Sequence, residues 1–315
     1  MPRRLGLPSV YLAAAAATAA ATAVPLAMTP ASGLTVRPAV TEPTRPYVVV
    51  ARGRAAARDL VGEVRWRVRR YYTAALPGFA TFLTAGELAA LRADPRVRAV
   101  EPDRQIHPMP VRPPARPLTG PATGAGTTIF LVDSGVDAQR AEFGDRAWRA
   151  FDATGGAGRD CTGHGTRIAG RAHAAAPAAG IASVRVLGCG GPGSLADLLA
   201  GLDWIRRHAR GPSVAVLPVD GAGSPALGAA VRSLVRSGVF VVGAGDAGGC
   251  RIGPGGAAYT AAVPHLAAAA ARRLEDTPGA NPAILASLLN CTIARDAIRQ
   301  NPSRALNLLM HSGGL

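Results

Sequence analysis

The sequence predicts an α/β protein built on a doubly wound parallel sheet, preceded by a smaller α+β module. From residue 127 onwards, short apolar runs of strand length alternate with longer segments of helical periodicity. That alternation is typical of parallel strands joined by right-handed helical crossovers. Between residues 45 and 106 the order is instead β-α-β-β-α-β, and a chain of 315 residues is long enough for both units.

The α+β module is expected over residues 45–106, with the element order of a ferredoxin-like fold. Its predicted elements are a strand at 47–50, a helix at 54–65, strands at 71–76 and 79–83, a helix at 84–94 and a strand at 97–100. Thr84 caps the second helix and Glu87 follows Thr84 by three residues, which is the spacing of a capping box. Asp94 and the proline after it end that helix.

A proline-rich linker is expected at residues 107–125. Five prolines stand among the eleven residues from His107 to Pro117, a composition that favours extended polyproline II. The larger domain is therefore expected to begin at about residue 126 and to run to about residue 311.

That larger domain supplies the parallel sheet. Its predicted strands are 127–132, 184–187, 214–219 and 239–244, and its predicted helices are 164–172, 194–205, 227–237, 261–274 and 282–289. The first strand runs directly into Asp133. Because open α/β sheets place their sites beyond the carboxyl ends of their strands, Asp133 is a candidate site residue.

The charge of the chain could indicate a nucleic-acid partner. The formal net charge is +15, and all 35 basic residues are arginine. A nucleic-acid-binding surface would cluster these charges, but the arginines are dispersed and aromatic residues make up only 4% of the chain. We therefore expect a solvated arginine surface and no nucleic-acid partner.

Residues 1–31 are typical of a cleaved export signal. Arg3 and Arg4 form a positive start, an apolar segment spans 10–23, and small residues at 27–31 offer a cleavage zone. The alternative is an uncleaved membrane anchor, but alanine-rich sequence and two prolines weaken a spanning helix. We expect a secreted protein with no membrane contact after cleavage.

Three short runs carry the candidate chemistry. Asp133 begins the run Asp-Ser-Gly, His164 stands in Gly-His-Gly-Thr, and Thr260 begins Thr-Ala-Ala-Val-Pro-His. Together these runs resemble the motifs of the subtilisin family of serine peptidases, in particular its secreted, proteinase K-like branch. The resemblance implies a subtilisin-like fold and a polypeptide substrate or peptide ligand. The module at 45–106 resembles the inhibitory propeptide of that family, a partner in cis whose tail lies across the cleft in relatives.

The resemblance assigns roles to three residues. Asp133 matches the orienting aspartate, His164 the general base, and Thr260 the position of the nucleophilic serine. Serine-type hydrolysis needs a hydroxyl, an imidazole and a carboxylate acting together. Thr260 retains a hydroxyl, but its methyl group restricts χ1 and crowds the approach to a substrate carbonyl. The alternative is that Thr260 is only a buried polar residue at the start of a helix.

A second departure from the family is Asp246. It follows the run Gly243-Ala244-Gly245, which the resemblance assigns to substrate binding, and it stands where the family has an asparagine that stabilises the oxyanion. Removing one such donor costs about 2.7–4 kcal/mol of transition-state stabilisation, and a carboxylate adds repulsion. A protonated carboxyl can donate, so activity confined to acid pH is an alternative.

Two further departures affect substrate binding. The substrate-binding strand of the family is matched by the run Pro218-Val219-Asp220-Gly221. Pro218 has no amide hydrogen to pair with an extended substrate, and Asp220 stands at a glycine position that lets substrate approach closely. In addition, nine residues between Cys250 and Thr260 are too few for the strands that relatives place there.

The four cysteines support export. By resemblance to proteinase K-like enzymes, Cys161 is expected to bond Cys189. Cys250 has a counterpart in relatives whose usual partner falls in the shortened segment, so Cys291 is the remaining candidate. Spacing alone allows three pairings. No His/Cys pair has zinc-ligand spacing, so we expect neither a metal nor a cofactor.

Three hypotheses about function follow. The first is a catalytically impaired pseudopeptidase that acts as a binding or decoy module. The second is a weak or acid-dependent endopeptidase that uses Asp133, His164 and Thr260. The third is a decaying gene product without a selected function.

Overall fold

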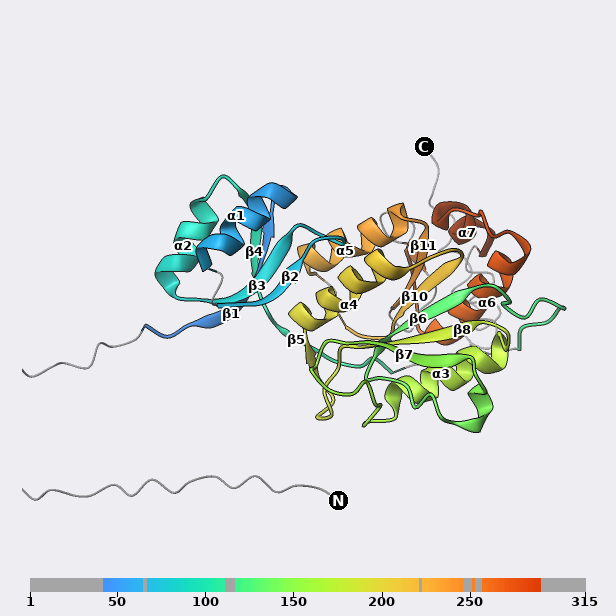
Figure 1. Cartoon of the computed structure of the whole chain (residues 1–315). Coiled ribbons are helices and arrows are strands. Elements are labelled where there is room, and N and C mark those ends of the chain that lie inside the picture. Colours follow the sequence, from blue (N-terminus) through green and yellow to red (C-terminus); the bar gives the residue numbers. More distant parts are fainter. Residues whose placement is uncertain are drawn as a thin grey trace, which may run out of the picture. The chain divides into compact units, whose positions relative to one another are not determined.

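The computed structural model describes residues 42–64, 67–110, 117–220, 223–245, 251–252 and 257–289. Within these ranges the chain forms the α+β module and then the α/β domain (Figure 1). The expected export signal at 1–31 lies outside the described residues. None of the described helices is long and apolar enough to span a bilayer.

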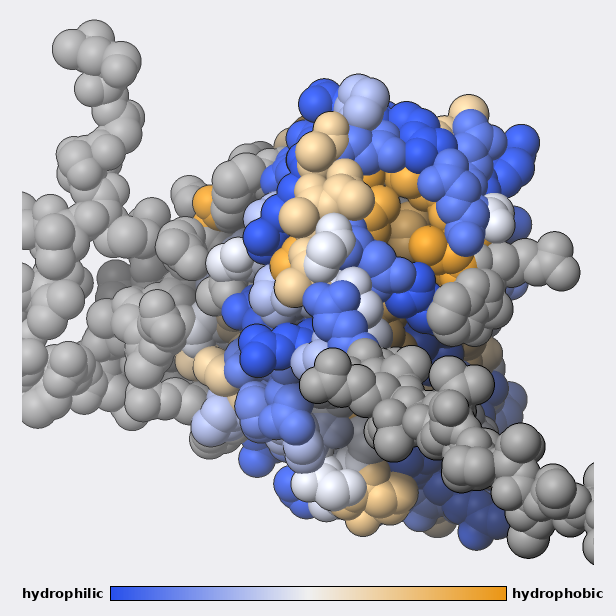
Figure 2. Space-filling model, turned by 90° about the vertical axis from the view of Figure 1, so that its left-hand side faces the viewer, coloured by the Kyte–Doolittle hydropathy of each residue, from blue (hydrophilic) through white to orange (hydrophobic). Residues whose placement is uncertain are grey.

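The α+β module is a four-stranded antiparallel sheet in the order β2-β3-β1-β4 with two helices. Its elements are β1 (Arg45–Ala51), α1 (Arg54–Val64), β2 (Val68–Tyr72), β3 (Gly78–Leu83), α2 (Ala85–Ala93) and β4 (Val97–Pro102). The capping box is confirmed, because Thr84 accepts from the Glu87 N–H while Glu87 accepts from the Thr84 N–H. The side of the molecule on which α1 and α2 lie has a mostly hydrophilic surface (Figure 2).

The predicted strand at 71–76 is wrong in its position. β2 ends at Tyr72, and residues 73–77 bend away from the sheet. The backbone N–H groups of Thr73, Ala74 and Ala75 all point at one carboxylate oxygen of Asp203, at 3.0, 2.7 and 2.8 Å. Three successive donors can converge on one atom only where the chain turns, so a long-range contact overrides the local strand propensity.

The α/β domain contains a seven-stranded sheet in the order β12-β13-β11-β10-β6-β8-β7, parallel except for β12 at one edge. Its strands are β6 (Thr128–Asp133), β7 (Ala147–Asp152), β8 (Gly180–Arg185), β10 (Ser213–Leu217), β11 (Val239–Ala244), β12 (Arg251–Ile252) and β13 (Ala258–Thr260). Its helices are the short 3₁₀ helix η2 (Ala141–Phe143), α3 (His164–Ala175), α4 (Leu195–His208), α5 (Pro225–Arg236), α6 (Val263–Asp276) and α7 (Pro282–Leu289). A separate two-stranded sheet joins β5 (Gln105–Ile106) to β9 (Gly193–Ser194).

Helices cover both faces of the large sheet (Figure 1). Ala215 and Val241 face the cluster that includes α4 and α5, while Val214 and Val242 face the cluster that includes α3 and α6. Strands buried on both faces are expected for a parallel sheet, which explains their continuous apolar runs. Tyr72 of the module belongs to the same cluster as α4 and α5, so the module and the domain share one core.

Four strands of the large sheet depart from the predicted pattern. β8 ends at Arg185 rather than at Leu187, because the N–H groups of Val186 and Leu187 both turn to the carbonyl of Asp133. β7 was not predicted, since its side chains are half-buried or exposed at an edge and form no apolar run. Two short strands that were not predicted, β12 and β13, lie in the segment that ends at Thr260 and have two and three residues.

Candidate active site

The two best-supported site residues meet where a strand ends and a helix begins. Asp133 is the last residue of β6 and is fully buried, while His164 is the first residue of α3. The Nδ1 atom of His164 lies 2.9 Å from both carboxylate oxygens of Asp133. A side chain added at Gly165 would overlap the carbonyl of Gly135, so the absence of a side chain at Gly165 permits the close approach.

A third acidic residue, Asp160, holds the histidine loop in place. Its carboxylate accepts from the Ser134 hydroxyl at 2.9 Å and from the N–H groups of Gly163 and Thr166, each at 2.9 Å. Burial raises the pKa of Asp160, but these hydrogen bonds outweigh it and hold the pKa below its ordinary value. The sequence motifs did not reveal this residue. An aspartate a few residues before a helix start is a known turn-forming signal and could have revealed it.

Thr260 is the last residue of β13 and only 4% exposed. Its hydroxyl oxygen accepts from the N–H of Ala262 at 3.1 Å, and its carbonyl accepts from the N–H of Gly245 at 3.1 Å. Within the described part of the chain, the Nε2 atom of His164 faces the carbonyl oxygen of Met109, at 3.2 Å, and not the Thr260 hydroxyl. The expected helix-start position of Thr260 is therefore corrected to a strand end, three residues before α6.

The segment that meets His164 is the beginning of the predicted linker. After β5, Pro108 forms an antiparallel bridge with Val219. The Met109 N–H donates to the carbonyl of Pro218 at 2.8 Å, and the Asp220 N–H donates to the carbonyl of His107 at 2.9 Å. Residues 107–109, here called the tail, thus add a strand to the run beginning at Pro218, which is β-augmentation.

Comparison with known proteins shows which proteins this chain resembles. The model of the peptidase inhibitor I9 family matches residues 48–109, which include most of the module and all of the tail. An extracellular serine proteinase of Thermus sp. (strain Rt41A) is 38% identical over 197 residues, covering 56% of this chain and 48% of its own. Alkaline serine exoprotease A of Vibrio alginolyticus is 33% identical over 218 residues, covering 60% and 41%. The chain is similar in sequence to subtilisin-like serine proteinases, and its N-terminal module matches the peptidase inhibitor I9 family.

The structural likeness agrees with that similarity at the level of the fold. Fervidolysin from Fervidobacterium pennivorans, a keratinolytic enzyme related to subtilisin, matches with a TM-score of 0.55 and 15% identity, over 76% of this chain and 56% of its own. The chain spans less than half the length of the two curated relatives described above.

The expectation that Pro218 would hinder pairing with an extended peptide is wrong for the tail. The strand uses only the carbonyl of Pro218 and the N–H of Asp220, so the missing proline N–H is not needed for pairing. Asp220 also does not keep the peptide away. Its carboxylate accepts from the His107 N–H at 2.6 Å. Gly221 and Asp246 lie outside the described residues.

Gly243, Ala244 and Gly245, which the resemblance assigns to substrate binding, have a packing role in the sheet. A side chain at Gly243 would meet the ring of Tyr259 at 2.8 Å, and one at Gly245 would meet the backbone of Thr260 at 3.0 Å. Ala244 pairs with Thr260 in the sheet. The absence of side chains at the two glycines therefore lets β13 pack closely against β11.

Both ring nitrogens of His164 face oxygen acceptors. A neutral imidazole has one N–H, whereas the imidazolium has two and can donate to Asp133 and to the Met109 carbonyl together. The hydrogen bond to Asp133 raises the pKa of His164, the bond to Met109 adds to this effect, and burial and Arg167 oppose it. With the tail in place, the His164 imidazole is therefore biased towards the protonated form, which cannot accept a proton.

This bias predicts a pH dependence of tail binding. Because the folded-state pKa is raised, the stabilisation is fully present below the unfolded pKa of about 6.5 and is lost as pH rises through the folded value. In a His107→Gln chain, which removes the histidine of the tail, the Met109 amide should be best protected from hydrogen exchange at acid pH. Further replacement of His164 by glutamine should abolish the trend, whereas His208→Gln on α4 should leave it. Protection that increases with pH would contradict the assignment.

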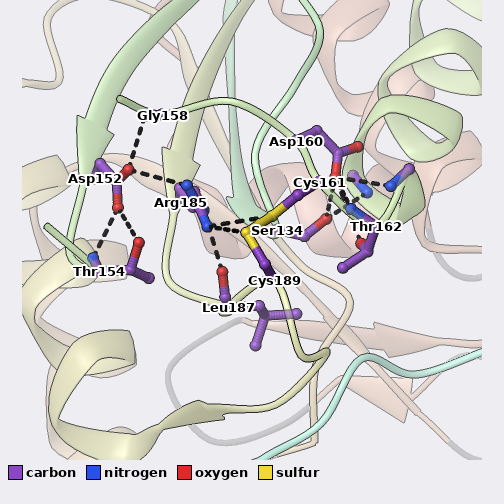
Figure 3. Close-up of a disulfide and its surroundings, with 12 residues drawn as sticks. Ser134, Asp152, Thr154, Gly158, Asp160, Cys161, Thr162, Arg185, Leu187 and Cys189 are labelled. Carbon is purple, nitrogen blue, oxygen red and sulfur yellow. Dashed lines mark hydrogen bonds and ion pairs between the residues drawn. A yellow bond between two sulfur atoms is a disulfide. The ribbon is translucent and has the colours of Figure 1, made fainter. Parts of the chain in front are cut away.

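The predicted Cys161–Cys189 disulfide is confirmed, with a Cα–Cα distance of 5.2 Å (Figure 3). It joins the loop before His164 to the loop after β8. Arg185 is 6% exposed and lies behind the disulfide, with Nη2 at 3.4 and 3.1 Å from the two sulfur atoms and Nη1 at 3.3 Å from Asp152. Cys250 and Cys291 lie outside the described residues, so their pairing stays a prediction.

The inhibitor-like module is fixed to the α/β domain by buried polar contacts as well as by the shared core. Glu101 accepts from a first-turn N–H group of α5 and Asp103 from one of α4, each at 2.8 Å. The dipole of each helix also favours a negative charge at this end. The hydroxyl of Tyr72, 1% exposed, donates to the carbonyl of Ala196 at 3.0 Å. Asp203 adds the three N–H contacts with residues 73–75 described above. The module therefore occupies a defined position on the domain.

Proposed function

We propose that this protein is a secreted subtilisin-family pseudopeptidase, a peptide-binding or decoy module whose cleft holds its own tail. The observation that carries the proposal is the 3.2 Å contact between the Met109 carbonyl and Nε2 of His164. In serine-type hydrolysis this nitrogen must receive the proton of the nucleophile. When the protonated ring donates to the Met109 carbonyl, Nε2 is no longer available to receive that proton.

The residues at the two remaining catalytic positions support impairment. Thr260 is buried, and its hydroxyl is engaged with the backbone of its own turn. Asp246 would place a carboxylate where negative charge develops, and losing a donor there costs about 10²–10³-fold in rate. Either change alone reduces catalysis, and together they remove both the attack and its stabilisation.

The bond that the tail presents supports a tail that stays uncut. The carbonyl at His164 belongs to Met109, so the bond in the cleavage position is Met109–Pro110. To break it, His164 would have to protonate the proline nitrogen, which carries a ring carbon in place of a hydrogen. That carbon is bonded to the nitrogen that must receive the proton, and it hinders the approach of His164. The tail is then an inhibitor that is not a substrate.

A second candidate function is a weak or acid-dependent endopeptidase that uses Asp133, His164 and Thr260. Its support is the intact His–Asp pair, with Nδ1 at 2.9 Å from both carboxylate oxygens. Protonation of Asp246 in acid would turn it into a donor. Hydrolysis measured over a range of pH separates this candidate from the pseudopeptidase. Accumulation of folded protein outside the cell separates both from a decaying gene product.

Secretion is part of the proposal. The Thermus relative is named as extracellular, and the N-terminal segment has the composition of an export signal. The disulfide between Cys161 and Cys189 fits an oxidising compartment.

The decisive experiment is the state of the exported protein. We expect mass spectrometry to find one chain from about residue 28–32 to Leu315, without a cut between Asp103 and Thr127, because a dead site cannot remove its own inhibitor. A fluorophosphonate probe should not label it at any pH. A new N-terminus in that interval, lost in a His164→Ala chain, would contradict the pseudopeptidase proposal.

A further inference from the structure

One residue of the cleft holds the tail through three separate contacts. Asp220 donates its N–H to the carbonyl of His107 at 2.9 Å and accepts the His107 N–H on Oδ1 at 2.6 Å. The second carboxylate oxygen lies 3.4 Å from Nδ1 of the His107 ring. Backbone and side chain of the same tail residue are therefore recognised together.

The negative charge of the Asp220 carboxylate can distinguish between bound peptides that carry different charges. The Asp220 side chain is 44% exposed, and within the described ranges His107 is its only hydrogen-bonding or ion-pairing partner. A glycine at this position, as in the matching run of relatives, could offer only its backbone. Asp220 therefore adds a negative charge to a strand whose other contacts are independent of sequence.

The register of the tail fixes which ligand residue meets this charge. The Met109 carbonyl lies at His164, and His107 is two residues before it. The residue between them, Pro108, makes none of these backbone bonds and needs no N–H. Only the residue two positions before the one at His164 thus presents its side chain to a carboxylate.

We propose that Asp220 makes this cleft selective for peptides with a basic side chain two residues before the one whose carbonyl meets His164. The inference rests on the proposed function of the cleft as a peptide-binding site and names the class of peptide. Lysine, arginine or protonated histidine pairs with Asp220 at that position, and glutamate or aspartate is repelled. Proline is excluded there, because it has no N–H for Oδ1.

The tail itself is the probe in the experiment. His107 is replaced by arginine, glutamine or glutamate in the full chain, each with Asp220 and with Asp220→Asn, which keeps the N–H and one acceptor oxygen. The readout is hydrogen exchange of the Met109 amide, whose acceptor is Pro218, at neutral pH and low salt. The amide of Val241 in β11 reports global unfolding in the same samples. Asp145→Asn, at a side chain 96% exposed, is the matched charge control.

We expect the Met109 amide to exchange about 2–5-fold more slowly with arginine than with glutamine at 107, and faster with glutamate, as for a partly exposed ion pair. Asp220→Asn should erase these differences, Asp145→Asn should not, and His107→Glu with Asp220→Arg should restore protection. Equal exchange for the three residues, or differences that persist in Asp220→Asn, would overturn the proposal. A change that appears equally at Val241 is global unfolding and counts against it. Peptide hydrolysis by the unaltered chain would instead contradict the pseudopeptidase function and leave these ratios interpretable.

Discussion

Thr260→Ser alone is expected to leave the protein uncut and without measurable peptidase activity. Serine supplies an unhindered hydroxyl that His164 and Asp133 could orient and deprotonate. The oxyanion would still face Asp246, a carboxylate where a donor is required. Adding Asp246→Asn should therefore help by more than the sum of the two separate effects, because catalytic groups act as a unit.

Even that double variant should not cut its own tail. The hydroxyl oxygen of residue 260 would attack the Met109 carbonyl, and His164 would take the hydroxyl proton and then deliver it to the nitrogen of Pro110 as the C–N bond breaks. Pro110→Ala replaces the ring carbon on that nitrogen by a hydrogen. We expect a cut after Met109 only in the chain that carries all three substitutions, detected as a new N-terminus at residue 110.

The matched control is Pro113→Ala, the same chemical change three residues further along the chain. When Pro113→Ala is added to the double variant in place of Pro110→Ala, the tail should remain uncut. Family-like turnover from Thr260→Ser alone at neutral pH would show that Asp246 does not occupy the oxyanion position. A cut at Met109–Pro110 with proline still present would show that the ring does not protect the bond.

Asp203→Ala is expected to cause the largest loss of stability of any single carboxylate replacement between the module and the domain. The Asp203 side chain is 1% exposed. Its replacement would leave the N–H groups of Thr73, Ala74 and Ala75 without their acceptor. A buried unsatisfied donor costs about 1–3 kcal/mol, and water will reach the less buried of the three, so we expect a loss of about 3 kcal/mol in the free energy of unfolding. Denaturant unfolding of the full chain measures it.

Two comparisons make this prediction specific. Asp203→Asn keeps an acceptor oxygen without the charge and should lose less. Asp145→Ala, at an exposed carboxylate, should stay within about 0.5 kcal/mol of the unaltered protein. If Asp203→Ala were as stable as Asp145→Ala, the contact with residues 73–75 would not hold the module.

Local features of the fold could be predicted from the sequence. Apolar periodicity located β6 and β11, and α7 was predicted with its observed bounds, because core-facing side chains repeat at the period of the element that buries them. The capping box at Thr84 involves residues three apart and forms as predicted. The edge strand β7 and the short strands β12 and β13 were missed, since only their neighbours in the sheet make them strands.

The sequence by itself determined the fold class, the family resemblance, the Asp133–His164 pair and the Cys161–Cys189 bond, because motifs and periodicity are local or recur across a family. Only the tertiary structure decided what occupies Nε2 of His164, since Met109 lies 55 residues earlier in the chain. It also decided that Asp220 binds the tail and that the missing N–H of Pro218 is not needed. Both depend on the register of two strands more than 100 residues apart, and a shift by one residue would exchange paired for unpaired backbone groups.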